Sequence, residues 1–294
     1  MDLPKCKNCD HESNAKDGVC SLKKASDGLP FRCVGAWSEA KHYYLKRYIE
    51  TFTTSMRKKW HGQLYYIDLF TGPGKCMARE TEREIDGSPL IALNTLYPFA
   101  RYFFVDLNDE VLNTLSERCK NHPNLKRVKL IRSDCNLVID DIITDIPPRS
   151  LSLAFIDPTG LHFKFPTLQK LAQRRVDLII TFPIDMAIKR NINKFLSEPH
   201  CPLDDVIGDT GWRQFSTGRE IIEYYRKKLT SLDYQDVKLG EEIPIRSINK
   251  NLPLYCLLFA SKHPLGHQFW QDISKIEHTG QRRFDFNGFP NLAF

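Results

Sequence analysis

The chain has 294 residues, a net charge of +6 and a hydrophobic content of 41% that includes 18 phenylalanines. This length and composition favour one large α/β domain with appendages over two equal domains. No apolar run approaches the ~18 residues of a membrane span, and the first residues contain no apolar signal region. The sequence therefore predicts a cytoplasmic protein without membrane contact, whose nine cysteines are thiols or metal ligands rather than disulfides.

The positive charge is concentrated near the N-terminus. Residues 1–62 contain 12 lysines and arginines against 7 acidic residues, whereas the remaining residues are nearly neutral. Basic character beside a cysteine cluster suggests a polyanionic partner such as nucleic acid. An ordinary solvated surface explains the same charge equally well, so both interpretations stay open.

Four cysteines occur in the first 36 residues, within a segment rich in turn formers and poor in core residues. Such a segment cannot fold by hydrophobic burial, and a tetrahedral Zn²⁺ site would contribute the missing folding free energy. An iron–sulfur cluster and a metal-free segment are the alternatives. We predict a structural zinc module over residues 1–36, with four ligands: Cys6, Cys9, Cys20 and Cys33.

A helix is predicted next, with Ser38 as its N-cap and apolar residues from Leu45 to Trp60 at helical spacing on one face. This stripe indicates core packing. The polar side is expected to extend the basic N-terminal surface with six residues: Lys41, Lys46, Arg47, Arg57, Lys58 and Lys59.

An apolar run at residues 64–67 predicts a buried strand that ends in an acid and a Gly-Pro-Gly turn. The glycines let the backbone approach a ligand, and the proline stiffens the loop. This pattern suits S-adenosylmethionine, whose ammonium group would lie near the carboxylate. The nucleotide alternative requires a third glycine, and Met77 occupies that position. We predict five cofactor-binding residues here: Asp68, Phe70, Gly72, Pro73 and Gly74.

The polar stretch 75–87 delays the next helix, which is expected to begin at Ser88 and Pro89. We interpret these 13 residues as an insertion over the cofactor or substrate mouth, with a disordered loop as the alternative. A second strand at 101–108 ends in Asp106-Leu107. The interval from the last glycine of the turn to Asp106 is 32 residues, and without the insertion it approaches the ~20 residues typical of a ribose-binding acid. Asp106 and Leu107 are therefore predicted cofactor ligands.

Further strands alternate with helices, which predicts a doubly wound, Rossmann-like sheet. The third strand, at 126–133, ends in Asp134-Cys135, where a carboxylate would lie beside the adenine. The fourth, at 151–156, ends in Asp157-Pro158, across the switch point where the transferred group would lie. A strand at 176–182 follows, then a capping box at Thr217 and expected strands at 235–238 and 253–260.

In combination, five segments resemble the three-Cys-motif partner family, a group with a class I methyltransferase-type Rossmann fold: residues 66–74, 86–90, 155–160, 177–183 and 254–262. The resemblance covers residues 37–277, the expected methyltransferase-like domain, and leaves 278–294 as a C-terminal tail. It implies S-adenosylmethionine binding and association with a radical-SAM-like protein bearing three cysteines. It implies no particular substrate and no oligomeric state.

Two functions are consistent with these features. The first is an S-adenosylmethionine-dependent methyltransferase acting on nucleic acid or a macromolecular partner, with Asp157 and Pro158 as catalytic residues facing the acceptor. Nucleic-acid amino methyltransferases continue with proline and an aromatic residue, whereas Thr159 follows here, and Phe163 or His162 would have to replace the stacking ring. The second is a non-catalytic, zinc-bearing nucleic-acid adaptor that binds the cofactor for its partner.

Overall fold

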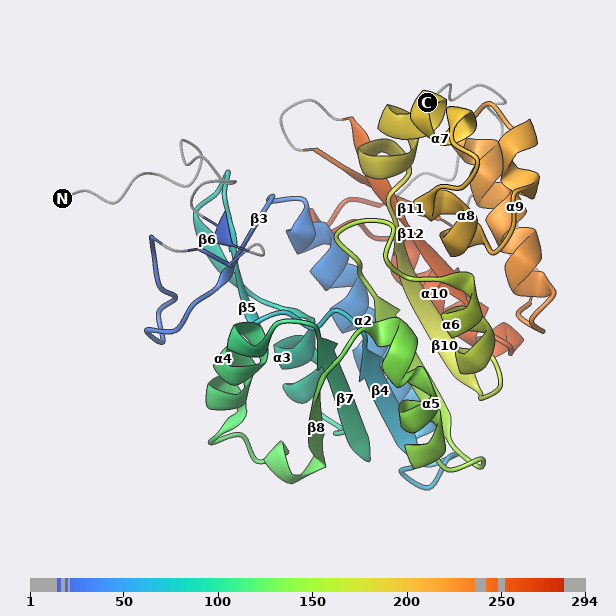
Figure 1. The fold of residues 1–294 in the computed structure, drawn as a ribbon. Coiled ribbons are helices and arrows are strands. Elements are labelled where there is room, and N and C mark those ends of the chain that lie inside the picture. The colour runs from blue at the N-terminus through green and yellow to red at the C-terminus, as the bar shows by residue number, and fades with distance from the viewer. Residues whose placement is uncertain (1–14, 17–18, 21, 236–241, 248–251, 283–294) are drawn as a thin grey trace.

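The computed structural model describes residues 15–16, 19–20, 22–235, 242–247 and 252–282. Its centre is a seven-stranded sheet with the order β8-β7-β4-β9-β10-β12-β11 (Figure 1). All neighbours pair in parallel except β12, which is antiparallel to both β10 and β11. The strands are β4 (Leu64–Asp68), β7 (Arg101–Asp106), β8 (Val128–Arg132), β9 (Leu151–Ile156), β10 (Val176–Phe182), β11 (Ile243–Arg246) and β12 (Pro253–Ala260).

Helices cover both faces of this sheet, as predicted for a doubly wound fold. Along β4, Tyr65 and Ile67 pack into one core, and Leu64 and Tyr66 pack into the other. The first core is closed by α5 (Cys135–Asp145), α6 (Phe165–Leu171), α7 (Arg190–Ser197), α8 (Pro202–Ile207) and α9 (Gly218–Thr230). The second is closed by α2 (Ser38–Met56), α3 (Ser88–Leu93), α4 (Asp109–Cys119) and α10 (Pro264–Ser274).

Shorter helical turns complete the connections. Two are 3₁₀ turns, Leu125–Arg127 and Gly211–Gln214, and a π-helical turn at Ile184–Lys189 precedes α7. The capping box at Thr217 is confirmed at the start of α9. The N-caps of α2 and α3 are Trp37 and Gly87, so the predictions of Ser38 and Ser88 were each wrong by one residue. The expected strand at 235–238 falls largely outside the described residues.

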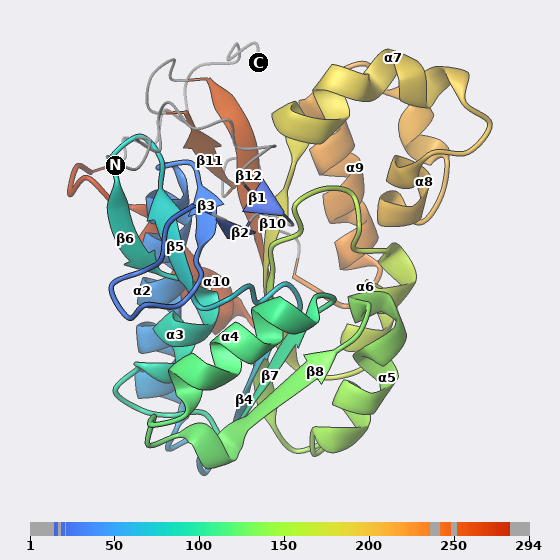
Figure 2. The ribbon, with the colours of Figure 1, turned by 60° about the vertical axis from the view of Figure 1, so that its left-hand side comes forward.

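A second, smaller sheet joins the segment before α2 to the hairpin after β4. Its order is β1-β2-β3-β5-β6, with β1 (Ala15–Lys16), β2 (Val19–Cys20), β3 (Arg32–Val34), β5 (Lys75–Ala78) and β6 (Arg83–Asp86). The predicted insertion is thus an ordered hairpin, and β3 pairs in parallel with β5. Figure 1 and Figure 2 show this sheet above α3 and α4. The described strands before residue 36 therefore form one sheet with the insertion.

Two of the four predicted zinc ligands lie in this small sheet. Cys20 and Cys33 are buried, and the pairing of Val19 with Arg32 places them diagonally on the same face of β2 and β3. Cys6 and Cys9 lie outside the described residues. Within the described ranges, no group of three or more His, Cys, Asp and Glu residues could hold a metal ion. The zinc site accordingly stays a prediction.

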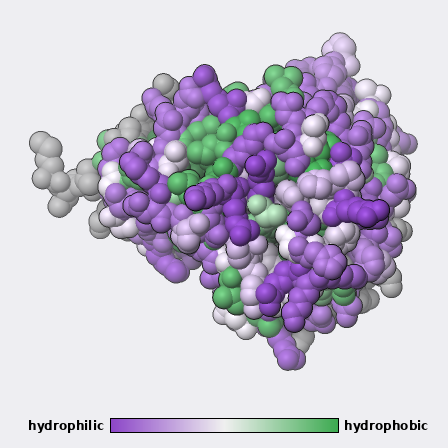
Figure 3. Space-filling model, turned by 90° about the horizontal axis from the view of Figure 1, so that it is seen from below, coloured by the Kyte–Doolittle hydropathy of each residue, from purple (hydrophilic) through white to green (hydrophobic). Residues whose placement is uncertain are grey.

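The surface and the helices agree in polarity. In the part of the chain that the structure describes, every helix is too short or too polar to span a bilayer. The face viewed from below is mostly hydrophilic, and hydrophobic residues reach it in patches (Figure 3).

Candidate functional site

The loop after β4 is shaped by two glycines in the left-handed region, Gly72 with φ +66° and Gly74 with φ +96°. A Cβ at Gly74 would lie 3.0 Å from a methyl of Leu115 and 3.2 Å from the side chain of Arg118, so this glycine lets the loop pack on α4. A Cβ at Gly72 would instead lie 3.7 Å from the guanidinium of Arg32. Of the two glycines, Gly72 is the one beside a functional side chain.

Asp106, at the end of β7, lies against this loop, as its predicted role requires. Its carboxylate accepts hydrogen bonds from the backbone N–H of Gly72 at 3.0 Å and of Asn108 at 3.1 Å. Because the acid ends a strand adjacent to β4, the fold brings both predicted acids to the same edge of the sheet. Leu107, the next predicted ligand, is 70% exposed.

Asp68 is fully buried at the end of β4. One carboxylate oxygen accepts from the N–H of Phe70 at 3.3 Å, and the other has no hydrogen-bond partner among the described residues. Burial raises the pKa of Asp68 to about 7; the nearby hydroxyl of Ser88 and the N–H of Phe70 oppose this shift, and the charges of Asp157 and Asp106 add to it. A buried acid with a free oxygen is costly to leave unpaired, so this position is suited to a cationic ligand group.

Arg32, on β3 of the small sheet, reaches over the glycine loop. Its guanidinium lies 3.8 Å from the carboxylate of Asp106 and is four-fifths buried. Its Nε is buried and makes no hydrogen bond within the described ranges. The neighbouring strand contributes Cys76, which is paired with Arg32 across the sheet and is buried. Burial raises the pKa of the Cys76 thiol to about 11, which makes it a poor nucleophile.

Asp157 follows β9 at the same edge and forms an ion pair with Lys41 of α2. The side chains are 20% and 10% exposed, respectively. Burial opposes the charge of Asp157, but the Lys41 ammonium outweighs it, and the pKa of Asp157 is lowered. Lys41 was expected on a solvated face, which is wrong because it lies four residues before Leu45 and so on the buried face of the helix.

Polar groups without partners gather around these acids. Among the described residues, the buried side-chain atoms without a hydrogen bond include Tyr66 Oη, Thr71 Oγ1 and His42 Nδ1. Tyr66 lies close enough to Asp68 and Asp157 for both charges to raise its pKa further, beyond the dominant effect of burial. Unpaired buried groups in such number mark a site that a polar ligand would complete.

The small sheet is tied to the glycine loop by charged residues. Arg118 of α4, whose side chain is almost completely buried, donates to the carbonyl of Pro73 and binds Asp27 through two nitrogens at 2.9 and 3.1 Å. Lys75 pairs with both Asp27 and Glu84. Although burial opposes the charge of Asp27, Arg118 and Lys75 hold its pKa at about 2. This network attaches the small sheet, which is the roof of the site, to the glycine loop and α4 on its floor.

The remaining predicted residues lie at the same sheet edge with structural contacts. Asp134 is the N-cap of α5 and accepts from the N–H of Asn136 at 2.8 Å. Cys135 is buried in the core beneath it. Phe163 is also a core residue, so it is not available for base stacking, whereas His162 is exposed. Pro158 follows Asp157 directly and is partly exposed.

A polar groove of about 380 Å³ runs between α2, β6 and α3. Its lining includes His42 and Lys46 from α2, Arg83 from β6 and Asn94 at the end of α3. His42 lies near enough to Lys41 and Asp157 for both charges to act on its imidazole, so this residue is the one that relates the groove to the ion pair.

The basic cluster at Arg57–Lys59 lies at the other end of α2. The 15 residues from Lys41 to Met56 span about 22 Å of helix at ~1.5 Å per residue. Within this cluster Arg57 makes a cation–π contact, with its guanidinium 3.6 Å from the ring centroid of Tyr97. A polyanion contacting both this cluster and Asp157 would therefore have to follow the length of the helix.

Sequence reasoning missed Lys41 and Arg32 as site residues. For Lys41 a usable pattern existed, since a lysine on an apolar helical stripe requires a buried partner. For Arg32 no local pattern existed, because its position depends on the pairing of β3 with β5, more than 40 residues later in the sequence.

No family model matches the chain, and no curated protein matches it. Solved structures with a similar fold include a protein from Legionella pneumophila, with a TM-score of 0.46, 12% identity and coverage of 82% of this chain and 94% of that one. A candidate O-methyltransferase from Klebsiella pneumoniae has a TM-score of 0.42, 9% identity and coverage of 88% and 91%. The methyltransferase domain of bacterial CtHen1 has a TM-score of 0.40, 16% identity and coverage of 74% and 99%. All three likenesses are distant, so function has to be inferred from the chain's own geometry.

Proposed function

We propose that this chain binds S-adenosylmethionine at the carboxyl edge of the large sheet and transfers its methyl group to a macromolecular acceptor. The observation that carries the proposal is the unpaired carboxylate oxygen of Asp68, buried beside a glycine loop that is itself hydrogen-bonded to Asp106. An antiparallel β12 between β10 and β11 also departs from the dinucleotide-binding order and is the arrangement of the class I methyltransferase fold.

The charges at this edge match the polar groups of the cofactor. Asp68 would accept from the ammonium group of the methionine moiety, and Asp106 from the ribose hydroxyls. The free Nε of Arg32 would donate to the methionine carboxylate, because a guanidinium recognises a carboxylate with charge-assisted hydrogen bonds. Asp134 would lie toward the adenine, and one of its carboxylate oxygens also accepts from the N–H of Asn136.

For methyl transfer, S-adenosylmethionine supplies an activated methyl group on a sulfonium. The chain then has to align the acceptor and exclude water, and proximity is the main contribution. Asp157, kept ionised by Lys41, would accept a hydrogen bond from an acceptor N–H or O–H and orient its lone pair toward the methyl group. The small sheet, through Arg32 and Cys76, would cover the site and exclude solvent.

One observation favours the second candidate, a cofactor-binding adaptor without catalysis. The carboxylate of Asp157 is largely buried and already occupied by Lys41, which is the arrangement expected of a structural pair. The two functions differ in one measurable result. An enzyme transfers label from tritiated S-adenosylmethionine to an acceptor, and an adaptor binds the cofactor without transfer.

The partners belong to the proposal as well. The basic N-terminal segment suggests nucleic acid as a partner, and the family resemblance suggests a radical-SAM-like protein with three cysteines.

Zn²⁺ would be held by Cys20 and Cys33 together with Cys6 and Cys9. The N–H of Lys23 already donates to the sulfur of Cys20 at 3.4 Å, a contact that suits a thiolate ligand.

Calorimetric titration with S-adenosylhomocysteine is the first test, because this demethylated product carries the same amino-acid and adenosine groups as the cofactor. The wild-type chain should bind it, and 5′-methylthioadenosine, which lacks the amino-acid part, should bind more weakly. Arg32→Ala should weaken the first ligand about tenfold and leave the second unchanged. Arg83→Ala, an exposed arginine of the same sheet, is the matched control. Tight binding of NAD with no binding of S-adenosylhomocysteine would refute the proposal.

Transfer is tested separately with tritiated cofactor against DNA, RNA and proteins. The salt dependence of any nucleic-acid complex then identifies phosphate contacts, since each contributes about −0.7 to −0.9 to the slope of log affinity against log salt concentration.

Metal analysis of chain purified without chelator should give about one zinc per chain.

A further inference from the structure

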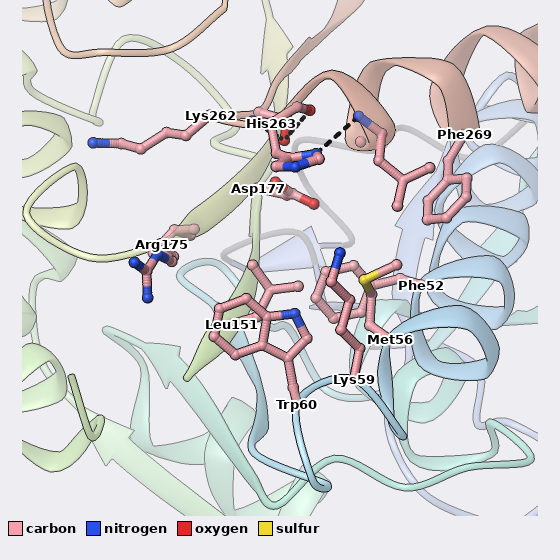
Figure 4. Close-up of a pocket in the computed structure, with 14 residues that line it drawn as sticks. Phe52, Met56, Lys59, Trp60, Leu151, Arg175, Asp177, Lys262, His263 and Phe269 are labelled. Carbon is pink, nitrogen blue, oxygen red and sulfur yellow. Dashed lines mark hydrogen bonds between the residues drawn. The ribbon is translucent and has the colours of Figure 1, made fainter. Parts of the chain in front are cut away.

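A second pocket lies at the opposite, amino-terminal edge of the large sheet. It is bounded by the end of α2, by Leu151 and Val176 at the starts of β9 and β10, and by the start of α10 (Figure 4). Its volume is about 200 Å³. Asp68, Asp106 and Asp157 all lie at the other edge, so this pocket is separate from the proposed cofactor site.

The interior of the pocket is apolar and aromatic. Phe52 and Met56 of α2 are buried core residues that form one wall, and Phe269 of α10 forms another. Trp60 closes the pocket from the side of the α2–β4 connection. Three rings around one small space favour a flat, apolar ligand group, because aromatic pairs gain from offset and edge-to-face contacts.

The rim of the pocket is positively charged. Arg175 lies with its guanidinium 5.6 Å from the centroid of the Trp60 ring. Lys59 is exposed, and its ammonium points into the space between Trp60 and Asp177 (Figure 4). Lys262 is directed aside, where it donates to the carbonyl of Ala172 at 2.6 Å.

Asp177 is the one acid among the lining residues. It is buried, and its carboxylate accepts from the hydroxyl of Tyr48 at 2.7 Å, so one of its oxygens is already engaged away from the pocket rim. The pocket therefore presents two available cations over an apolar interior, a combination that selects a ligand with an anionic end and an apolar body.

We propose that this pocket binds a small aromatic carboxylate, with its ring between Phe52, Met56 and Phe269 and its carboxylate at Lys59 and Arg175. The aromatic lining is the reason for proposing a ring in the ligand, and the two rim cations are the reason for proposing an anionic end. The volume determines the size, since it is smaller than the ~300–1,000 Å³ of pockets that hold drug-sized ligands. The proposal does not depend on the methyltransferase assignment.

The test uses 3-phenylpropionate as the probe and compares it with 3-phenylpropylamine and 3-phenylpropanol, which keep the ring and change the charge. Binding to the full chain is followed by calorimetry, and the site by nuclear Overhauser contacts between the phenyl ring and the Met56 methyl group. The carboxylate should bind saturably and about tenfold more tightly than the alcohol, because hydrogen bonds to a charged group are stronger than neutral ones, and exposure of the rim limits the gain. The amine should bind most weakly.

Charge reversal locates the carboxylate. Lys59→Glu and Arg175→Glu should each weaken 3-phenylpropionate about tenfold and should strengthen the amine. Lys58→Glu is the matched control, since Lys58 is an exposed neighbour outside the pocket and the change of net charge is identical. Leu265→Trp should fill the pocket and abolish binding of all three probes.

Three results would overturn the proposal. The first is the absence of saturable binding of 3-phenylpropionate up to about 10 mM. A dissociation constant above that concentration would be too weak for the ring and carboxylate contacts proposed here. The second is equal binding of the amine. The third is an identical effect of Lys59→Glu and Lys58→Glu, which would mean that the affinity follows the net charge of the chain and not the pocket.

Discussion

The role proposed for the buried acid Asp68 predicts that cofactor binding depends on pH. Its pKa is raised to about 7, chiefly because the carboxylate is buried, and it must be ionised to pair with an ammonium group. Between pH 8 and pH 6 the ionised fraction of a group with this pKa falls from about nine tenths to about one tenth. Affinity for S-adenosylhomocysteine should therefore fall about tenfold over the same interval.

Two further measurements follow from the same carboxylate. At pH 7 binding should release about half a proton per chain, because a group with this pKa is half protonated there; calorimetry detects the release as an enthalpy that varies with the ionisation enthalpy of the buffer. Asp68→Asn should remove both the proton release and the pH dependence attributed to this group, and should bind more weakly than wild type at pH 8. Asp109→Asn, an exposed acid on α4, is the control and should behave as wild type.

Stability should change in the opposite direction to binding. Because the pKa of Asp68 is higher in the folded chain than the usual 3.8, the ionised group costs stability, and this cost grows as the pH rises from about 4 to 7. Three units at ~1.36 kcal/mol each give about 4 kcal/mol as its upper limit. Asp68→Asn should recover about 1–3 kcal/mol at pH 8, since the new amide still needs a partner, and the gain should vanish near pH 4. Urea unfolding at both pH values measures it. A variant that is destabilised at pH 8, or a wild-type affinity independent of pH, would refute the reasoning.

Three other expectations concern neighbouring contacts. Asp106→Ala should weaken S-adenosylhomocysteine binding about tenfold to a hundredfold in calorimetry, because it removes a charged acceptor, whereas the exposed Glu117→Ala should have no effect. Lys41→Met should cost about 2–3 kcal/mol in urea unfolding at pH 7, below the ~3–5 kcal/mol of a fully buried pair because Asp157 is partly exposed. The exposed Lys46→Met is the control and should cost less than about 0.5 kcal/mol of unfolding free energy. Asp157→Leu added to Lys41→Met should restore most of the stability that Lys41→Met loses. Additive losses in the double variant would contradict the pairing. Arg118→Met should release the small sheet and speed hydrogen exchange at β3 and β5 relative to β4, and unchanged exchange there would show that Asp27 and Pro73 do not hold the roof.

The sequence by itself determined the five parallel strands of the large sheet and the position of its acids, whereas the edge strand β11 was not predicted. Apolar runs of five to seven residues that alternate with helices can be buried only as parallel strands between two helical layers. Parallel strands end at the same edge, so Asp68, Asp106 and Asp157 had to lie near one another wherever the helices went. The capping box at Thr217 was equally readable, because its two hydrogen bonds join residues three apart.

Only the tertiary structure decided what surrounds these acids. Lys41 belongs to the helix before the first large-sheet strand, and its ion pair with Asp157 spans 116 positions in the sequence. Arg32 reaches Gly72 and Asp106 because the hairpin after the glycine loop pairs with β3, which turns a polar insertion into a roof. Sequence periodicity describes which face of an element is buried, but it does not describe which distant element covers that face. For this reason the floor of the site was predictable from the chain, whereas its cations and its roof appear only where separate segments meet.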